Sequence, residues 1–205
     1  MQDQTDRWFR LLGGPDWDGP AGRDCAVSEM RALGTEAVFP LLIRKLASSD
    51  LEVRCAAIEA LGLVDAARAV EPLIPLLSDS EEVVRMCVCE ALSDPMANAA
   101  VDPLLVVLRD DPDSQVRNYA AGALGHIGSR AVIPALLRTM DSDHEMDIHG
   151  HSPSHCAAMA LDDLLETNFT RIKVSESTCK MRPGPPDLDA LRKRAMEEYE
   201  KWTNE

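Results

Sequence analysis

The hydrophobic positions of this chain recur in two interleaved series that share one period. In the first series, Ala-Val-x-Pro is followed by a run of leucines, and successive prolines stand 31 or 32 residues apart. These prolines are Pro40, Pro72, Pro103 and Pro134. In the second series, Val-Arg pairs ending at Arg54, Arg85 and Arg117 recur at the same interval, each followed by an Ala-Leu pair. Two independent series with one period predict a tandem repeat of about 31 residues.

Each half of the repeat predicts one helix. Proline fits the first helical turn, because its missing N–H would have no partner there anyway, so Ala-Val-x-Pro predicts the start of the first helix. Val70, Leu73, Ile74 and Leu77 then form one apolar stripe at helical spacing, and we expect Pro75 to distort this helix.

The Val-Arg half predicts the second helix of the repeat. Short acidic loops precede it, and Asp50 and Asp113 are expected to cap it with side-chain oxygens. Gly62 and Gly125 follow the Ala-Leu pairs, and we interpret them as left-handed residues that end the helix.

A single helix pair of this size cannot bury its apolar stripe, so neighbouring pairs must cover it. The predicted fold is therefore all-α, a right-handed α-solenoid of about five helix pairs with capping helices at both ends. We expect residues 1–22, which hold Trp8, Phe9 and Trp17, to cap the first repeat, and 23–168 to form the solenoid. The polar, proline-rich residues 169–186 are interpreted as a linker, and 187–205 as a C-terminal capping helix that Asp187 begins.

Read together, the two series give the motif a-V-x-P-L-L…D-x-x-V-R-x-x-A-A-x-A-L-G. Over roughly residues 24–167 it resembles the HEAT-repeat family, in particular the short bacterial repeats of the phycobilin-lyase type. The resemblance implies a ladder between each motif arginine and the acidic residue four before it. The implied pairs are Asp50/Arg54, Glu81/Arg85 and Asp113/Arg117. Deoxyhypusine hydroxylases of this superfamily place His-Glu iron ligands after the arginine, where this chain has other residues, so no iron site is carried over.

Charge and composition narrow the classes of partner. The chain has 21 Lys and Arg against 35 Asp and Glu, a formal net charge of −14, which argues against binding nucleic acid or anionic membranes. No apolar run approaches the roughly 20 residues of a membrane span, and the N-terminus lacks a signal-peptide pattern. Most of the six cysteines lie in alanine-rich apolar segments, as free thiols of a cytoplasmic protein would. We expect a protein partner with a basic or mixed surface, and the oligomeric state stays open.

The residues one, five and nine positions after each motif arginine should face the groove of the solenoid. In the first two complete repeats they are Cys55, Glu59, Leu63, Met86, Glu90 and Asp94. The residues favoured for binding a partner are Glu59, Met86, Glu90, Asn118, His126, His155 and Met159. This row has no pair of a base and a nucleophile, so we predict a protein-interaction scaffold without catalytic residues or a cofactor.

A histidine-rich segment, 144–155, supports an alternative. About five residues are inserted here between two helices, and insertions in a solenoid often mark a binding face. A metal site could use imidazole and carboxylate ligands from His144, Asp147, His149, His151 and His155. The competing interpretation is a solvated loop that picks up a divalent metal adventitiously. The enzymatic alternatives are a metal-dependent reaction at this loop or a phycobilin-lyase-like activity, which would need an apolar trough although aromatics make up only 4% of the chain.

Overall fold

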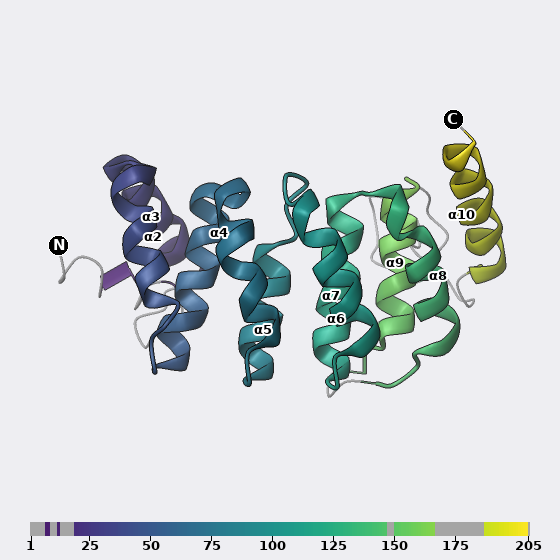
Figure 1. The fold of residues 1–205 in the computed structure, drawn as a ribbon, viewed down its shortest axis with the longest axis horizontal. Helices are drawn as coiled ribbons and strands as arrows, with labels where there is room; N and C mark the ends of the chain where they lie inside the picture. The colour runs from purple at the N-terminus through teal and green to yellow at the C-terminus, as the bar shows by residue number, and fades with distance from the viewer. Residues whose placement is uncertain (1–6, 9–11, 13–18, 147–149, 167–186, 205) are drawn as a thin grey trace, which may run out of the picture. The chain divides into compact units, whose positions relative to one another are not determined.

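The structure, a computed structural model, describes residues 7–8, 12, 19–146, 150–166 and 187–204 (Figure 1). Every regular element within these ranges is a helix, which confirms the all-α prediction. The chain divides into two compact units, Met1–Ala100 and Val101–Glu205. None of the described helices combines the length and the apolar character needed to cross a bilayer.

The first unit contains α2 (Gly19–Leu33), α3 (Thr35–Lys45), α4 (Leu51–Leu73), the 3-10 helix η1 (Ile74–Ser78), α5 (Glu82–Ala91) and the short η2 (Asn98–Ala100). α4 is two helices in one, because Asp65 has an extended backbone (φ −157°, ψ 83°). The Asp65 carboxylate accepts a hydrogen bond from the Arg68 backbone N–H at 3.2 Å, and so caps the second half. The break separates the two helices that the sequence predicts here.

The second unit contains α6 (Val101–Asp110), α7 (Ser114–Ile127), the 3-10 helix η3 (Arg130–Val132), α8 (Ile133–Ser142), α9 (Pro153–Leu164) and α10 (Leu188–Thr203). In the described part of the chain, four complete helix pairs follow α2. Within each unit the helices pack on one another, as α4 does on α3 and α5, and α7 does on α6 and α9. Leu61, Leu92 and Leu124, the leucines of the second series, are fully buried in this packing.

Helix starts follow the predicted chemistry at most positions. Asp50 accepts hydrogen bonds from the backbone N–H groups of Glu52 (3.0 Å) and Val53 (3.3 Å), and Asp113 does the same two and three residues on. Pro103 and Pro134 lie in the first turns of α6 and α8.

Three prolines differ from this pattern, and one of them, Pro72, lies inside the half of α4 that Asp65 caps. Pro40 lies further inside α3, because Ala37 and Val38 already donate to the carbonyl of Gly34 and add a turn before it. Pro75 lies at the start of η1, where the helix tightens to 3-10 geometry, and this confirms the expected distortion.

The glycine prediction is wrong, and the structure shows another use for these residues. Gly62 and Gly125 lie inside helices, while α7 ends at Gly128 with a left-handed φ of 77°. A Cβ on Gly62 would meet Ala91 of α5 at 3.1 Å, and one on Gly125 would lie 2.7 Å from the Cβ of Ala160 in α9. Glycine is therefore required by the close approach of neighbouring helices rather than by helix termination.

Two of the motif arginines form a ladder, but their carboxylates are not those implied by the family resemblance. Asp50 and Asp113 cap their own helices, and Arg54 and Arg117 reach forward to the next loop. Arg117 pairs with Asp143 at 2.6 Å, and Arg54 approaches Asp79 at 3.9 Å. A second contact repeats along the chain, since each motif arginine donates to the carbonyl six residues earlier. These bonds run from Arg54 to Ser48 (2.8 Å), from Arg85 to Asp79 (3.0 Å) and from Arg117 to Asp111 (2.8 Å).

Both ends of the chain contribute packed residues. Trp8 is 2% exposed, and its indole N–H donates to Glu29 of α2 at 3.0 Å, while Arg7 binds the same carboxylate at 2.9 Å. The indole hydrogen bond, supported by Arg7, lowers the pKa of Glu29. Phe9 and Trp17 lie outside the described residues, as does the expected linker 169–186.

At the other end, α10 packs against α8 and α9. Asp187 caps it by accepting from the Ala190 N–H at 2.9 Å, and Leu191 and Ala195 are buried. Trp202, near the end of α10, stays 40% exposed.

Candidate functional site

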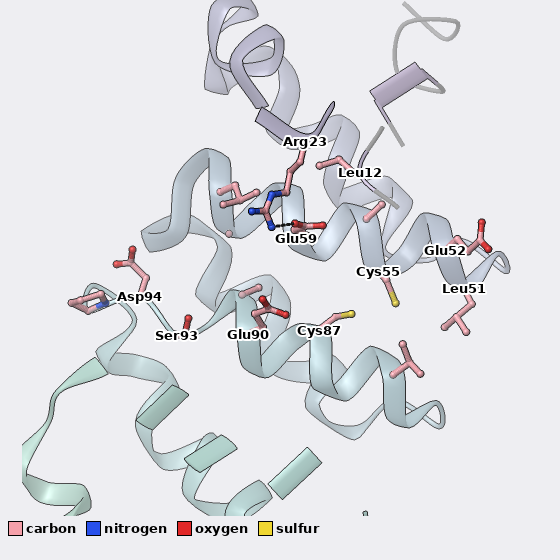
Figure 2. A pocket seen from close by; sticks show the side chains of 16 residues that line it. Leu12, Arg23, Leu51, Glu52, Cys55, Glu59, Cys87, Glu90, Ser93 and Asp94 are labelled. Carbon is pink, nitrogen blue, oxygen red and sulfur yellow. Dashed lines mark hydrogen bonds and ion pairs between the residues drawn. The ribbon is translucent and has the colours of Figure 1, made fainter. Parts of the chain in front are cut away.

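A groove of about 830 Å³ lies in the first unit, over α4 and α5 (Figure 2). Successive turns of α4 contribute Leu51, Cys55, Glu59 and Leu63, which share one face because they are four residues apart. The complete lining consists of Leu12, Arg23, Leu51, Glu52, Cys55, Ala56, Glu59, Gly62, Leu63, Val83, Cys87, Glu90, Ala91, Ser93, Asp94 and Pro95.

The side chains that line the groove are charged mainly negatively. The lining contains four carboxylates and one guanidinium. The guanidinium belongs to Arg23 from α2, which pairs with Glu59 at 3.1 Å. The carboxylates belong to Glu52, Glu59, Glu90 and Asp94. Apolar side chains lie between these charges, and the close approach of Gly62 to Ala91 keeps the groove floor free of large groups. The site therefore combines an apolar surface with acidic walls.

The pKa of Glu59, one of the groove carboxylates, is raised above its ordinary value. Burial raises its pKa, the hydrogen bond and charge of Arg23 oppose that rise, and the neighbouring Glu90 adds to it. Burial in a place with another carboxylate disfavours the ionised form, because its charge is both desolvated and repelled. A cation that entered the groove would relieve this penalty.

The two cysteines of the groove interact directly. The thiol of Cys87, on α5, donates a hydrogen bond to the sulfur of Cys55, on α4. This bond is the main cause that lowers the pKa of Cys55, and with burial it raises the pKa of Cys87. Figure 2 shows both sulfurs on the same side of the groove.

Of the six residues that the spacing places on the groove face in these two repeats, all except Met86 are among the residues that line it. Cys55, Glu59, Leu63, Glu90 and Asp94 all line the groove. Met86 does not belong to the lining, and its neighbour Cys87 takes the facing position. Sequence reasoning missed Cys87 because it assumed that the same offset from the arginine faces the groove in every repeat. The sequence does contain a sign that Cys87 occupies the position equivalent to Cys55. The two cysteines are 32 residues apart, which nearly equals the repeat period of about 31 residues.

The remaining expected contact residues lie in the second unit and differ in exposure. Asn118 on α7 is buried, with 7% of its surface exposed. His126 near the end of the same helix is exposed, as are His155 and Met159 on α9. The last three therefore present side chains that a partner could contact.

The histidine-rich insertion is confirmed as an enlarged connection. Residues 143–152 join α8 to α9, whereas only 111–113 join α6 to α7. Arg117 holds the beginning of this loop through Asp143 and Glu145, both at 2.6 Å.

The expected metal ligands lie only partly within the described residues. His144, His151 and His155 are exposed, whereas Asp147 and His149 fall outside those residues. Among the residues that the structure describes, no three His, Cys, Asp or Glu side chains are grouped so as to hold a metal ion.

Comparison with known proteins gives the chain a family context. A family model for HEAT repeats matches residues 39–121 and 101–151. Among solved structures, an engineered protein is similar with a TM-score of 0.54 and 19% identity, over 98% of each chain. No curated protein matches significantly.

Two further solved structures are more distant. The CpcE–CpcF complex of phycocyanin lyase from Nostoc has a TM-score of 0.45 and 17% identity, over 96% of this chain and 98% of that one. A designed armadillo repeat protein in complex with the peptide (KR)4 has a TM-score of 0.47 and 17% identity, over 94% of this chain and 98% of that one.

Proposed function

Because this chain belongs to the HEAT-repeat family, we propose that it is a protein-interaction scaffold whose acidic groove binds a basic segment of a partner protein. Repeat proteins of the HEAT and armadillo type are generally protein-binding scaffolds, and their stacked helices provide extended surfaces for this purpose. The proposal concerns the groove over α4 and α5, because the structure describes every residue that lines it.

The observation that carries the proposal is the charge of the groove. Arg23 is the one cationic residue among those that line the groove, and it forms an ion pair with Glu59 rather than with Glu90 or Asp94. A lysine or arginine from a partner would compensate these carboxylates and lower the raised pKa of Glu59. The negative field would also steer a basic partner toward the site.

The apolar part of the lining defines the rest of the occupant. Leu51, Leu63 and Val83 line the groove, and Leu63 and Val83 are partly exposed, at 37% and 36%. An aliphatic side chain placed over them would bury apolar area at about 25 cal/mol per Å². We therefore propose a segment in which arginine or lysine alternates with leucine-sized residues.

Residues of the second unit are a separate part of the proposal. His126, His155 and Met159 are exposed on α7 and α9, and we propose them as additional contacts for the same class of partner. Their contribution is tested by Met159→Ala, which should weaken partner binding without changing the selectivity of the groove for basic residues.

The experiment that tests the groove is a selection from a random dodecapeptide library with the purified chain as bait. We expect enriched peptides to contain arginine or lysine together with leucine-sized residues. The selection is repeated with the Glu59→Lys/Glu90→Lys variant, which reverses the charge of the walls. Loss of the basic peptides from that second selection supports the proposal, and recovery of the same peptides with both baits refutes it.

A further inference from the structure

A pair of thiols lies inside the groove, and the scaffold function does not use it. Cys55 comes from the first half of α4 and Cys87 from α5, so the two belong to adjacent repeats. Both line the groove, which makes them accessible to small molecules from the solvent. The helices that carry them are packed closely, as the 3.1 Å approach of a Cβ on Gly62 to Ala91 shows.

We propose that Cys55 and Cys87 form a site of reversible thiol–disulfide exchange, in which a low-molecular-weight disulfide converts the two thiols into a bond between α4 and α5. Disulfide formation requires two sulfurs that can meet without movement of the backbone, and here the two side chains extend toward one another from helices that pack together (Figure 2). The two residues are not bonded covalently in the structure, which corresponds to the reduced state.

The surroundings give the two thiols different roles. The hydrogen bond from Cys87 lowers the pKa of Cys55, and the charge of Arg54 contributes to this, so Cys55 is the more readily ionised of the two thiols. The same hydrogen bond, burial and the nearby Glu90 and Glu59 raise the pKa of Cys87, which disfavours its thiolate. The thiolate is the nucleophile in exchange, so Cys55 attacks first and Cys87 resolves.

The reaction balances with a disulfide RSSR as the oxidant. The Cys55 thiolate attacks one sulfur of RSSR, and this forms a mixed disulfide and releases RS⁻. Cys87 then loses its proton to solvent and attacks the Cys55 sulfur, and the second RS⁻ leaves. The two protein thiols are oxidised by two electrons in total, RSSR is reduced to two RSH, and an excess of RSH reverses the reaction.

Cys89 and Cys25 do not line the groove. Cys89, two residues from Cys87, is fully buried on the opposite side of α5. Cys25 is exposed and interacts with the carboxylate of Glu29 at 3.7 Å. Neither residue lines the groove, so Cys25 serves as the comparison in the experiment below.

The experiment treats the folded full-length chain with oxidised glutathione and then maps its disulfides by mass spectrometry after alkylation. We expect a peptide that links Cys55 to Cys87, loss of two hydrogens from the intact mass, and full reversal by reduced glutathione. The Cys25→Ser variant should give the same link. A wild-type protein whose main product is glutathione on Cys25, with no Cys55–Cys87 peptide, would overturn the proposal.

A second variant tests the order of the two steps. In Cys87→Ser the resolving thiol is absent, so the mixed disulfide with glutathione should accumulate on Cys55 and stay there. In Cys55→Ser, modification of Cys87 should be slower, because burial and the nearby Glu90 and Glu59 still disfavour its thiolate. Equal rates of modification in the two variants would contradict the assigned roles. Neither measurement depends on a protein partner. The proposal of thiol exchange can therefore be refuted while the proposal of partner binding stands, and the reverse.

Discussion

Single small residues decide how closely the helices of neighbouring repeats can approach. Gly125 and Ala160 lie at the contact of α7 and α9, and Gly62 and Ala91 lie at that of α4 and α5. The sequence showed these glycines at equivalent places in the repeat but not their purpose. A glycine after an Ala-Leu pair fits a helix end and a helix contact equally well, and only the position of the neighbouring helix separates the two.

Gly125→Ala should destabilise the protein, because the added Cβ would lie 2.7 Å from that of Ala160 and 2.9 Å from its Cα. Overpacking of this kind costs about 1–3 kcal/mol, measured as the free energy of unfolding in urea. Gly122→Ala is the matched control in the same helix, since its Cβ would meet nothing within 4 Å. It should be neutral or stabilising by up to about 1 kcal/mol. Equal destabilisation by both substitutions would show that the contact is not tight.

Glu59 links the acidity of the groove to the stability of the fold. Its pKa is raised in the folded state, so its contribution to stability is complete below the unfolded pKa of roughly 4.3. That contribution is lost as the pH rises through the folded pKa. Glu59→Gln, which can still accept from Arg23, should therefore be more stable than the wild type at neutral pH and equal to it near pH 4.

Urea titrations of both proteins across this pH range measure the difference. The exposed Glu71→Gln, outside the groove lining, is the control for removing one negative charge elsewhere. A Glu59→Gln protein that is less stable than the wild type at neutral pH would show that the ion pair with Arg23 outweighs the burial of the carboxylate.

At the scale of the elements, the arginines join one repeat to the loop of the next. Arg117, whose side chain is 10% exposed, binds the carbonyl of Asp111 in its own loop and the carboxylates of Asp143 and Glu145 in the following loop. The same residue therefore fixes the start of α7 and the start of the long histidine-rich connection. The two carboxylates are the main causes that raise the pKa of Arg117, which keeps its charge throughout the accessible pH range.

Arg117→Met should cost about 2–4 kcal/mol of unfolding free energy, because it leaves Asp143 half-buried without its partner. Methionine retains an apolar chain in place of the arginine methylenes, so the decrease in unfolding free energy measures the contribution of the guanidinium. Arg109→Met is the control, since that arginine pairs with its neighbour Asp110 and both are well exposed. We expect little change for the control in the same urea measurement, and a similar loss in both variants would contradict the role of Arg117.

The positions of the helices along the chain were predictable from the sequence. The rotation of each helix about its own axis, which decides the face it turns to its neighbours, was not. The prolines, the Val-Arg pairs and the capping aspartates located the helices because each reflects a local property of the backbone. Which face of α5 looks into the groove depends on how α5 rotates against α4, and a one-residue error there exchanged Cys87 for Met86. The forward pairing of Arg117 with Asp143 was missed for the same reason, as the partner lies 26 residues away.

For the whole molecule, an excess of 14 negative charges favours a basic partner, and the groove shows where some of that charge gathers. The net charge was readable from composition, but the position of the groove was not. It depends on Arg23 from α2 and on residues 93–95 after α5, which approach α4 only in the folded unit.

The most direct test of the central claim is the affinity of the groove for a cationic probe. A fluorescein-labelled dodecapeptide of alternating arginine and leucine is titrated with the wild type and with Glu59→Gln/Glu90→Gln, followed by anisotropy. Glu71→Gln/Glu200→Gln, two exposed glutamates outside the groove lining, controls for net charge. We expect the groove variant to bind at least about tenfold more weakly, roughly 1.4 kcal/mol, while the control stays close to the wild type. Equal weakening in both variants would mean that the probe responds to total charge, and the groove would not be the binding site.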